Sequence, residues 1–443
     1  MEWAVSPNLI YNGKIFYFYH IPSLWSIILS MKILEVVNSL GIGGTERTAV
    51  NFSIGLTNKG CDVIVFSLNG GIRERELDSH HIPIIIGLER LKLLSNQWIP
   101  DIIHVHNHGI DSHIQREVCE LYPNSYVCEQ NVFGVPSNYS KLDCSFQLSK
   151  WSQWNYINRK IKINHRIEIL PNPINSENFY PASFSERNAF RNKYNIPLDS
   201  TVLLRIGQPI VAKWNVKIID VFIDLKKKYA NLFLLCIGAP QNIIDYSKKR
   251  NVYSNLLFID KITNDKDLRV CYSSCDIFLH MARIGESFGI VLLEAMLCGT
   301  PIVTVNTPYC DNAQSEVVGH MVGGIVANRY KGILHAVSKL IEDKQLRAEL
   351  AIKGRESAIS RYELEYVTNY LLSYIKEKNN AQSKYSIELK DVRAYLSDAI
   401  DKPIPFAANI FILKKYFLSF LPERVFRYMV RCYCRFFDKS VQL

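Results

Sequence analysis

The sequence has few of the features that mark membrane-spanning, metal-binding or disordered proteins. None of its 443 residues lies in an uninterrupted apolar run of the roughly 20 residues that a membrane span requires. The 11 cysteines are scattered singly except for close pairs at 271/275 and 432/434, and neither pair has a second pair at zinc-site spacing. No long stretch is both polar and low in complexity. The sequence therefore favours a folded chain whose thiols are reduced and structural, as in a cytosol.

Length and charge narrow the possible classes further. A chain of 443 residues and 51.0 kDa exceeds what one hydrophobic core usually serves, so two domains with appendages are expected. The formal net charge of +10 favours anionic partners such as phosphates, nucleotides or lipid head groups. Nucleic acid is disfavoured as a partner because the excess charge gathers near the C-terminus and no nucleic-acid motif is present.

Short apolar runs alternate with helical patterns in both halves of the chain. The runs occupy residues 33–37, 63–67, 102–106 and 125–128, and then 201–206, 232–237, 256–259, 277–280 and 301–305. Strands that alternate with helices indicate parallel sheets with right-handed crossovers. Prolines at 171, 173 and 181 interrupt the pattern between the halves. We therefore predict two Rossmann-like α/β domains that face a cleft, at 31–175 and 176–378, the last helix being a candidate to pack back on the first domain.

The two ends of the chain are interpreted separately. Residues 1–30 are apolar and aromatic but interrupted by His20 and Pro22, so we expect neither a signal peptide nor a span, and Met31 is the expected functional start. Residues 379–443 form an extension in which five cations recur every three or four positions: Arg424, Arg427, Arg431, Arg435 and Lys439. With an aromatic face opposite these cations, segment 406–439 fits either a helix on an anionic membrane surface or one docked on the domains.

A glycine-rich turn lies between the first expected strand and the helix after it. Residues 38–47 read NSLGIGGTER, and Gly43 and Gly44 allow backbone N–H groups to approach a ligand. The helix N-terminus would add about half a positive charge aimed at an anion. The GxGxxG dinucleotide fingerprint is not met, because Glu46 stands where the third glycine belongs. Taken alone, the turn is either an anion-binding loop or merely a tight turn.

A second motif, ARIGESFGIVLLEAM at 282–296, follows the expected strand 277–280. Glu286 precedes a helix and Glu294 lies eight positions on, so we expect both carboxylates to face one cleft about two turns apart. Between them lie consecutive backbone N–H groups that are candidates to hold a diphosphate, those of Ser287, Phe288, Gly289, Ile290 and Val291. The carboxylates would accept hydrogen bonds from sugar hydroxyls.

The paired glutamates with Phe-Gly between them, followed by CGTPIV at 298–303, closely resemble the signature of the retaining family 4 glycosyltransferases. The GGTE loop at 43–46, the DIIHVH strand at 101–106 and Asn-Pro at 172–173 extend the resemblance over about residues 31–375. The resemblance implies the GT-B fold and transfer of a hexose-type sugar from a nucleoside diphosphate sugar to an acceptor hydroxyl, with retention of configuration. Such enzymes generally need no cofactor and no metal.

The same resemblance implies roles for individual residues. Glu294 corresponds to the glutamate that holds the nucleotide ribose, and Glu286 to the one beside the donor sugar. Residues 205–214, RIGQPIVAKW, match the loop that neutralises the diphosphate, and Lys213 matches its lysine. Gln208 stands where the family has an arginine, so Arg205 and Arg283 are the candidate replacements. The substitution matters because one lost donor to developing phosphate charge costs about 3 kcal/mol.

Acceptor-side candidates come from the first domain. His104 and His106 share one face of a strand, and Asn131 lies in CEQNVFG at 128–134, where many relatives have a histidine. We expect His106 and Asn131 on the acceptor side of the cleft. A zinc site is not expected, because the histidines lack a third ligand at a persuasive spacing. Glu316 opens a later helix, and we interpret it as structural.

The sequence thus predicts a cytoplasmic glycosyltransferase, peripheral to the membrane, that takes a nucleotide sugar donor and a glycan or lipid-linked acceptor in cell-surface polysaccharide or glycolipid synthesis. Two alternatives stay open, since a fold alone does not fix a function. One is a sugar-nucleotide epimerase of the same fold. The other, favoured by Gln208, is a catalytically weak nucleotide-sugar-binding subunit of a glycan-assembly complex.

Overall fold

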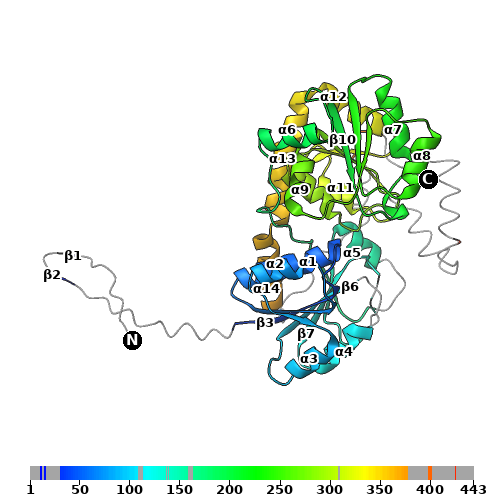
Figure 1. Ribbon diagram of the computed structural model, residues 1–443. Helices are drawn as coiled ribbons and strands as arrows, with labels where there is room; N and C mark the ends of the chain where they lie inside the picture. Colours follow the sequence, from blue (N-terminus) through cyan, green and yellow to red (C-terminus); the bar gives the residue numbers. More distant parts are fainter. Residues whose placement is uncertain are drawn as a thin grey trace.

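The computed structural model describes residues 10–11, 14–15, 30–107, 113–135, 137, 139–157, 163–307, 310–377, 398–401 and 425. The predictions for the N-terminal extension and for segment 406–439 fall almost wholly outside these residues. Two short strands, β1 (Ile10–Tyr11) and β2 (Lys14–Ile15), pair antiparallel ahead of the main body. The rest forms two α/β domains, blue to cyan and green to yellow in Figure 1.

The first domain is built on a seven-stranded parallel sheet. Its strands, in spatial order, are β5 (Ile84–Ile86), β4 (Asp62–Asn69), β3 (Lys32–Ser39), β6 (Ile102–Asn107), β7 (Tyr126–Asn131), β8 (Cys144–Gln147) and β9 (Arg166–Ile169). Its helices are α1 (Gly44–Asn58), α2 (Glu74–Ser79), α3 (Leu88–Leu94), α4 (His113–Leu121) and α5 (Lys150–Ile157). The central strands are buried on both faces, as strands between two helical layers must be. The strand order reverses between β3 and β6, which places a crevice at their carboxyl ends.

The second domain repeats this plan with six parallel strands. They are β12 (Leu256–Ile259), β11 (Leu232–Ile237), β10 (Thr201–Ile206), β13 (Ile277–His280), β14 (Ile302–Val305) and β15 (Gly324–Ala327). The helices are α6 (Phe184–Lys193), the 3₁₀ turn η2 (Val211–Lys213), α7 (Lys217–Lys226), α8 (Gln241–Lys249), α9 (Asp265–Ser273), α10 (Ile290–Leu297), α11 (Ala313–Val318), α12 (Tyr330–Glu342) and α13 (Lys344–Tyr362). Here the order reverses between β10 and β13, so a second crevice opens beside the loop after β10 and the start of α10.

The last described helix, α14 (Leu364–Lys376), returns to the first domain. Its buried residues Leu364, Val367 and Leu371 join the apolar core formed by α1 and the first sheet. Figure 1 shows α14 beside α1, away from the second sheet. The chain therefore crosses between the domains twice, and Ile174 in the first crossing pairs with the backbone around Glu363 in the second.

Two Rossmann-like parallel sheets confirm the predicted fold class. Strands β5, β8, β9 and β15 were not anticipated from the sequence, and the exact division of the chain at residue 175 stays a prediction, since β9 ends at Ile169 and β10 begins at Thr201. Among the described residues, no helix has both the length and the apolar character needed to cross a bilayer.

Candidate active site

A cavity of about 400 Å³ lies between the two domains, where their crevices face each other. The first domain lines it with the glycine-rich turn and with residues that follow β7, β8 and β9: Ile42, Gly43, Gly44, Thr45, Glu46, Val132, Phe133, Leu148 and Asn172. The second domain contributes the loop after β10 and the segment leading into α10: Arg205, Ile206, Gly207, Gln208, Lys213, Glu286, Ser287, Phe288, Gly289, Ile290 and Val291. The two motifs singled out in the sequence thus meet across one cavity.

Lys213 and Glu286 form an ion pair on the wall of the second domain. Lys213 Nζ lies 2.5 Å from Glu286 Oε2, while His280 Nε2 lies 3.2 Å from Oε1. Burial alone would raise the pKa of the Glu286 carboxyl, but Lys213 and His280 outweigh burial and hold that pKa well below its usual range. Glu286 is therefore an anion at neutral pH, and Lys213 offers the cavity a cation.

His280, at the end of β13, holds Glu286 from behind. Its Nδ1 lies 3.0 Å from the Thr304 hydroxyl on β14. Burial lowers the pKa of His280 to about 4, so the ring is neutral near pH 7. The arrangement fits a tautomer in which Nε2–H donates to Glu286 and Nδ1 accepts from Thr304. His280 was not among the residues expected from the sequence.

Gly289 shapes the start of α10. It is the N-cap residue of that helix with φ +94°, a conformation that favours glycine. A Cβ at this position would lie 2.7 Å from Leu292 Cδ1 and 3.3 Å from Glu286 Cγ. Ile290 and Val291, the first two residues of the helix, line the cavity beside Glu286, and the start of a helix is suited to an anion.

The loop after β10 differs from the expectation for Arg205. The side chain lines the cavity, but Nη1 donates to the Ile206 carbonyl, Nη2 donates to the Lys213 carbonyl, and the guanidinium stacks on Trp214. Arg205 therefore braces the loop that carries Lys213. Gln208 lines the cavity, and Arg283 is not among the described residues that line it.

Glu294 is placed differently from the expectation that both glutamates face the cavity. It is 4% exposed on α10 and is not among the described residues that line the cavity. Its Oε2 accepts from Tyr272 at 2.9 Å, and its Oε1 lies 3.5 Å from Arg47 Nε of the first domain. Burial raises the pKa of the Glu294 carboxyl, against the effect of Arg47. The expectation is corrected because an arginine of the facing domain covers this carboxylate.

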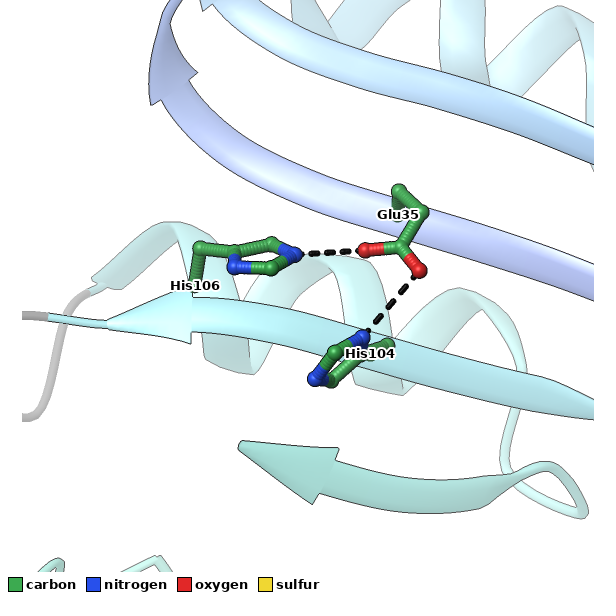
Figure 2. A group of neighbouring side chains, drawn as sticks. All are labelled: Glu35, His104 and His106. Atoms are coloured by element: carbon green, nitrogen blue, oxygen red, sulfur yellow. Dashed lines mark hydrogen bonds and ion pairs between the residues drawn. The ribbon is translucent and has the colours of Figure 1, made fainter. Parts of the chain in front are cut away.

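His106 does not lie on the acceptor side of the cavity either. Figure 2 shows His104 and His106 on β6 pointing at Glu35 on the neighbouring β3. His104 Nδ1 lies 3.1 Å from Glu35 Oε1, and His106 Nε2 lies 2.5 Å from Oε2. All three are buried. Burial would raise the pKa of Glu35, yet the two histidines lower it to about 2, and burial lowers the pKa of His106.

Glu35 is the third partner that the histidines were expected to lack, so that expectation is wrong. The three side chains carry atoms close enough to share a metal ion. However, each imidazole is already in hydrogen-bond contact with its own carboxylate oxygen, and the outer ring nitrogens, His104 Nε2 and His106 Nδ1, have no hydrogen-bond partner among the described residues. Metal-bound histidines normally donate that outer N–H to a partner. We interpret the group as a hydrogen-bonded triad in the sheet core.

Asn131 is also buried behind the cavity wall. Its amide donates to Glu129 Oε1 at 3.0 Å and to the Val135 carbonyl at 2.8 Å. The side chain is fully buried and does not line the cavity. The acceptor-side role expected for Asn131 is therefore corrected to one of holding the loop after β7, which carries Val132 and Phe133 into the cavity.

Glu316 joins the domains at another point. Its carboxylate oxygens accept from the Lys150 backbone N–H at 3.0 and 3.3 Å, at the N-terminus of α5 in the first domain. An anion is favoured there by the helix dipole. The structural role expected for Glu316 is in keeping with this contact.

The sequence of the second domain matches a known family. Residues 186–357 match the family described as glycosyl transferases group 1. This domain belongs to the glycosyl transferases group 1 family. The group 1 domain supplies Lys213, Glu286 and the start of α10 to the cavity. This domain also contains the motif at 282–296, with its two glutamates, on which the resemblance in the sequence mainly rests.

Three proteins that match 44–78% of this chain are also glycosyltransferases or share its fold. An uncharacterized glycosyltransferase of Haemophilus influenzae is 20% identical over 72% of this chain and 93% of its own length. The lipopolysaccharide glucosyltransferase WaaG of Escherichia coli is 29% identical over 44% of this chain, which spans about half (51%) of WaaG. The crystal structure of Anabaena HepE in complex with UDP-glucose is similar in fold, with a TM-score of 0.65 and 17% identity over 78% of this chain and 100% of that one.

Proposed function

We propose that the protein is a retaining glycosyltransferase that moves a hexose-type sugar from a nucleoside diphosphate sugar to an acceptor hydroxyl. The observation that carries this proposal is the pairing of Lys213 with Glu286 beside the open N-terminus of α10, in a cavity between two Rossmann-like domains. A cation and consecutive backbone N–H groups are suited to a diphosphate, and a carboxylate is suited to sugar hydroxyls. The group 1 domain supplies all three.

In the proposed complex, the diphosphate lies on the N–H groups of residues 287–289 and draws Lys213 Nζ away from Glu286. Glu286, still held by His280, then accepts hydrogen bonds from the donor sugar. Glu294 receives the ribose hydroxyls. Lys213 takes the larger share of charge neutralisation because Gln208 carries none and Arg205 is committed to backbone carbonyls.

The proposed reaction proceeds on one face of the sugar. The bond between the anomeric carbon and the phosphate oxygen breaks, and the acceptor oxygen forms its bond to that carbon on the same face. The acceptor proton passes to the departing phosphate oxygen, so the step balances without a protein base. Positive charge for the leaving group comes from Lys213 and from the α10 N-terminus, and we propose that neither a metal ion nor a cofactor is needed.

The acceptor would approach from the first domain. That wall is largely apolar, with Ile42, Val132, Phe133 and Leu148 around the glycine-rich turn. WaaG is named as a lipopolysaccharide glucosyltransferase, and the HepE structure holds UDP-glucose. We therefore propose a UDP-sugar as the first donor to test and a cell-surface glycan or lipid-linked intermediate as the acceptor, handled on the cytoplasmic face of the membrane.

The test is a panel of UDP-, GDP-, ADP- and dTDP-sugars incubated with the full chain, with release of nucleoside diphosphate as the readout. One donor is expected to release its nucleotide, and Lys213→Met is expected to lower that rate at least about a hundredfold, as loss of a donor to developing charge does. Lys217→Met is the matched control, because Lys217 pairs with Asp220 outside the cavity. An equal loss in both variants would contradict the assigned role of Lys213.

The two alternatives give different products in the same panel. An epimerase would convert the sugar of the donor without any release of nucleotide, which chromatography of the unreacted donor detects. A weak binding subunit would bind one nucleotide sugar and release nothing, even with lipid extract or oligosaccharide added as acceptor. Either result would displace the transferase proposal.

Peripheral membrane binding through segment 406–439 lies outside the described residues and stays a prediction. Truncation after Asn379 is expected to lower partition of the protein onto anionic liposomes. Unchanged partition would end that idea.

A further inference from the structure

Arg47 joins the two domains at the carboxylate proposed for the ribose. It lies in the first turn of α1, directly after the glycine-rich turn. Its Nη1 and Nη2 lie 2.7 and 2.5 Å from the two oxygens of Asp265, which is the first residue of α9. Its Nε lies 3.5 Å from Glu294 Oε1, and its guanidinium lies over the ring of Phe179 in the interdomain connection. One side chain of the first domain thus contacts three segments beyond it.

The contacts of Arg47 are largely buried and have a fixed geometry. Its side chain is 9% exposed and that of Glu294 is 5% exposed, so solvent screens their attraction weakly. The paired N–H groups of an arginine match a carboxylate in a fixed geometry, and Asp265 is favoured at its own helix N-terminus. A cation in the first turn of α1, by contrast, opposes the dipole of α1. Its position is therefore explained by the second domain.

Each oxygen of the carboxylate proposed for the ribose has a protein partner in this arrangement. Tyr272 donates to Glu294 Oε2, and Arg47 lies against Oε1. A ribose diol needs acceptors on the same oxygens. Glu294 is absent from the described residues lining the cavity, although Ile290 and Val291 on the same helix line it.

We propose that Arg47 is a positioning residue that competes with the nucleotide ribose for Glu294. Domain opening withdraws Arg47 and exposes Glu294, and the ribose hydroxyls replace the arginine there. This inference rests on the proposed function. Arg47 then sets the affinity for the donor. Only molecules in which Glu294 is uncovered can bind the ribose, so the apparent affinity is the intrinsic affinity multiplied by the fraction of such molecules.

The test is the dissociation constant of UDP, GDP, ADP and dTDP for the full chain, measured by isothermal titration calorimetry. Arg47→Gln is expected to bind the preferred nucleotide about tenfold more tightly than the wild type, because the ribose no longer has to displace a buried, weakly screened ion pair from Glu294. Lys59→Gln is the control. It removes a cation at the C-cap of α1, the opposite end of the helix from Arg47, and breaks the exposed Lys59–Glu365 pair. The control is expected to keep the wild-type constant.

The outcomes separate the inference from the proposed function. If Arg47→Gln binds as the wild type does, or more weakly, the competition is refuted, and weaker binding would make Arg47 a contact of the nucleotide itself. If neither the wild type nor any folded variant binds any of the four nucleotides, the proposed function fails as well. Should Arg47→Gln not fold by circular dichroism, Arg47→Lys serves, because lysine keeps the charge but not the two-pronged geometry. It is expected to bind more tightly than the wild type, and an unchanged constant would refute the proposal.

Discussion

Replacing Gly289 with alanine tests whether the start of α10 is shaped as the structure describes. At φ +94° a residue with a Cβ pays about 1–2 kcal/mol for the left-handed backbone. The new Cβ would also lie 2.7 Å from Leu292 Cδ1, and crowding of this kind costs a further 1–3 kcal/mol, roughly. We expect the free energy of unfolding to fall by about 3 kcal/mol, measured by urea denaturation with far-ultraviolet circular dichroism.

Gly299→Ala is the matched control for this measurement. Gly299 follows the other end of the same helix at φ +74°, and a Cβ there would meet only Pro181 Cγ at an ordinary 3.5 Å. It therefore carries the backbone cost alone, about 1 kcal/mol. We also expect Gly289→Ala to weaken nucleotide binding at least about tenfold, because displaced N–H groups no longer converge on the anion, whereas Gly299→Ala leaves it unchanged. Equal losses of stability in the two variants would refute the crowding argument, and unchanged nucleotide binding in Gly289→Ala would refute the anion site.

Three further predictions concern ionisable groups. The pKa of His280 is about 4 in the folded protein and about 6.5 in the unfolded chain, so the unfolded chain binds more protons between these two pH values. The free energy of unfolding should therefore fall by about 3 kcal/mol as the pH drops from 6.5 to 4. Urea denaturation at several pH values should show that this part of the pH dependence is missing in His280→Gln, and an unchanged pH dependence would contradict the prediction. The pKa of Glu35 is lowered to about 2, so this group stabilises the fold above pH 4.5, and the stabilisation is lost as the pH falls toward 2. Glu35→Ala should lower the free energy of unfolding at pH 7 by about 3–5 kcal/mol, because both imidazoles lose their partner. A decrease of less than about 1 kcal/mol would refute the triad. Glu316→Gln should lower the unfolding free energy by less than about 1 kcal/mol, the worth of a charge at a helix N-terminus, with nucleotide affinity unchanged in calorimetry.

Much of the fold follows from local pattern. The four strands β10, β11, β12 and β13 begin and end where their apolar runs do, because a buried parallel strand must be apolar on both faces. The strands that escaped notice lack that signal. β5 has only three residues, and β8 reads Cys-Ser-Phe-Gln, so its polar side chains are buried by hydrogen bonds such as Ser145 to Glu129 that the sequence does not display.

In the candidate site too, local sequence predicted some residues and missed the contacts between distant parts of the chain. Within the continuous motif at 282–296, Glu286 and Ser287 lie on the cavity as expected, whereas Glu294 does not. Contacts between distant parts of the chain were not foreseen. Arg47 and Asp265 are 218 positions apart, and Glu35 is 69 positions from His104. A signal for Arg47 did exist, because a cation in the first turn of a helix is unfavourable unless something outside that helix holds it.

The double crossing between the domains bears on how they move. At the crossing, the Ile174 N–H donates to the Tyr362 carbonyl at 2.8 Å, and the Leu364 N–H donates to the Ile174 carbonyl at 3.1 Å. The two connections are therefore paired with each other at this point. Because the domains are linked by two segments that are hydrogen-bonded to each other, a movement of one domain against the other involves both segments together. A protease that cuts one connection would leave the two domains joined by the other. Because α14 packs on the first domain, it would still link the second domain to the first.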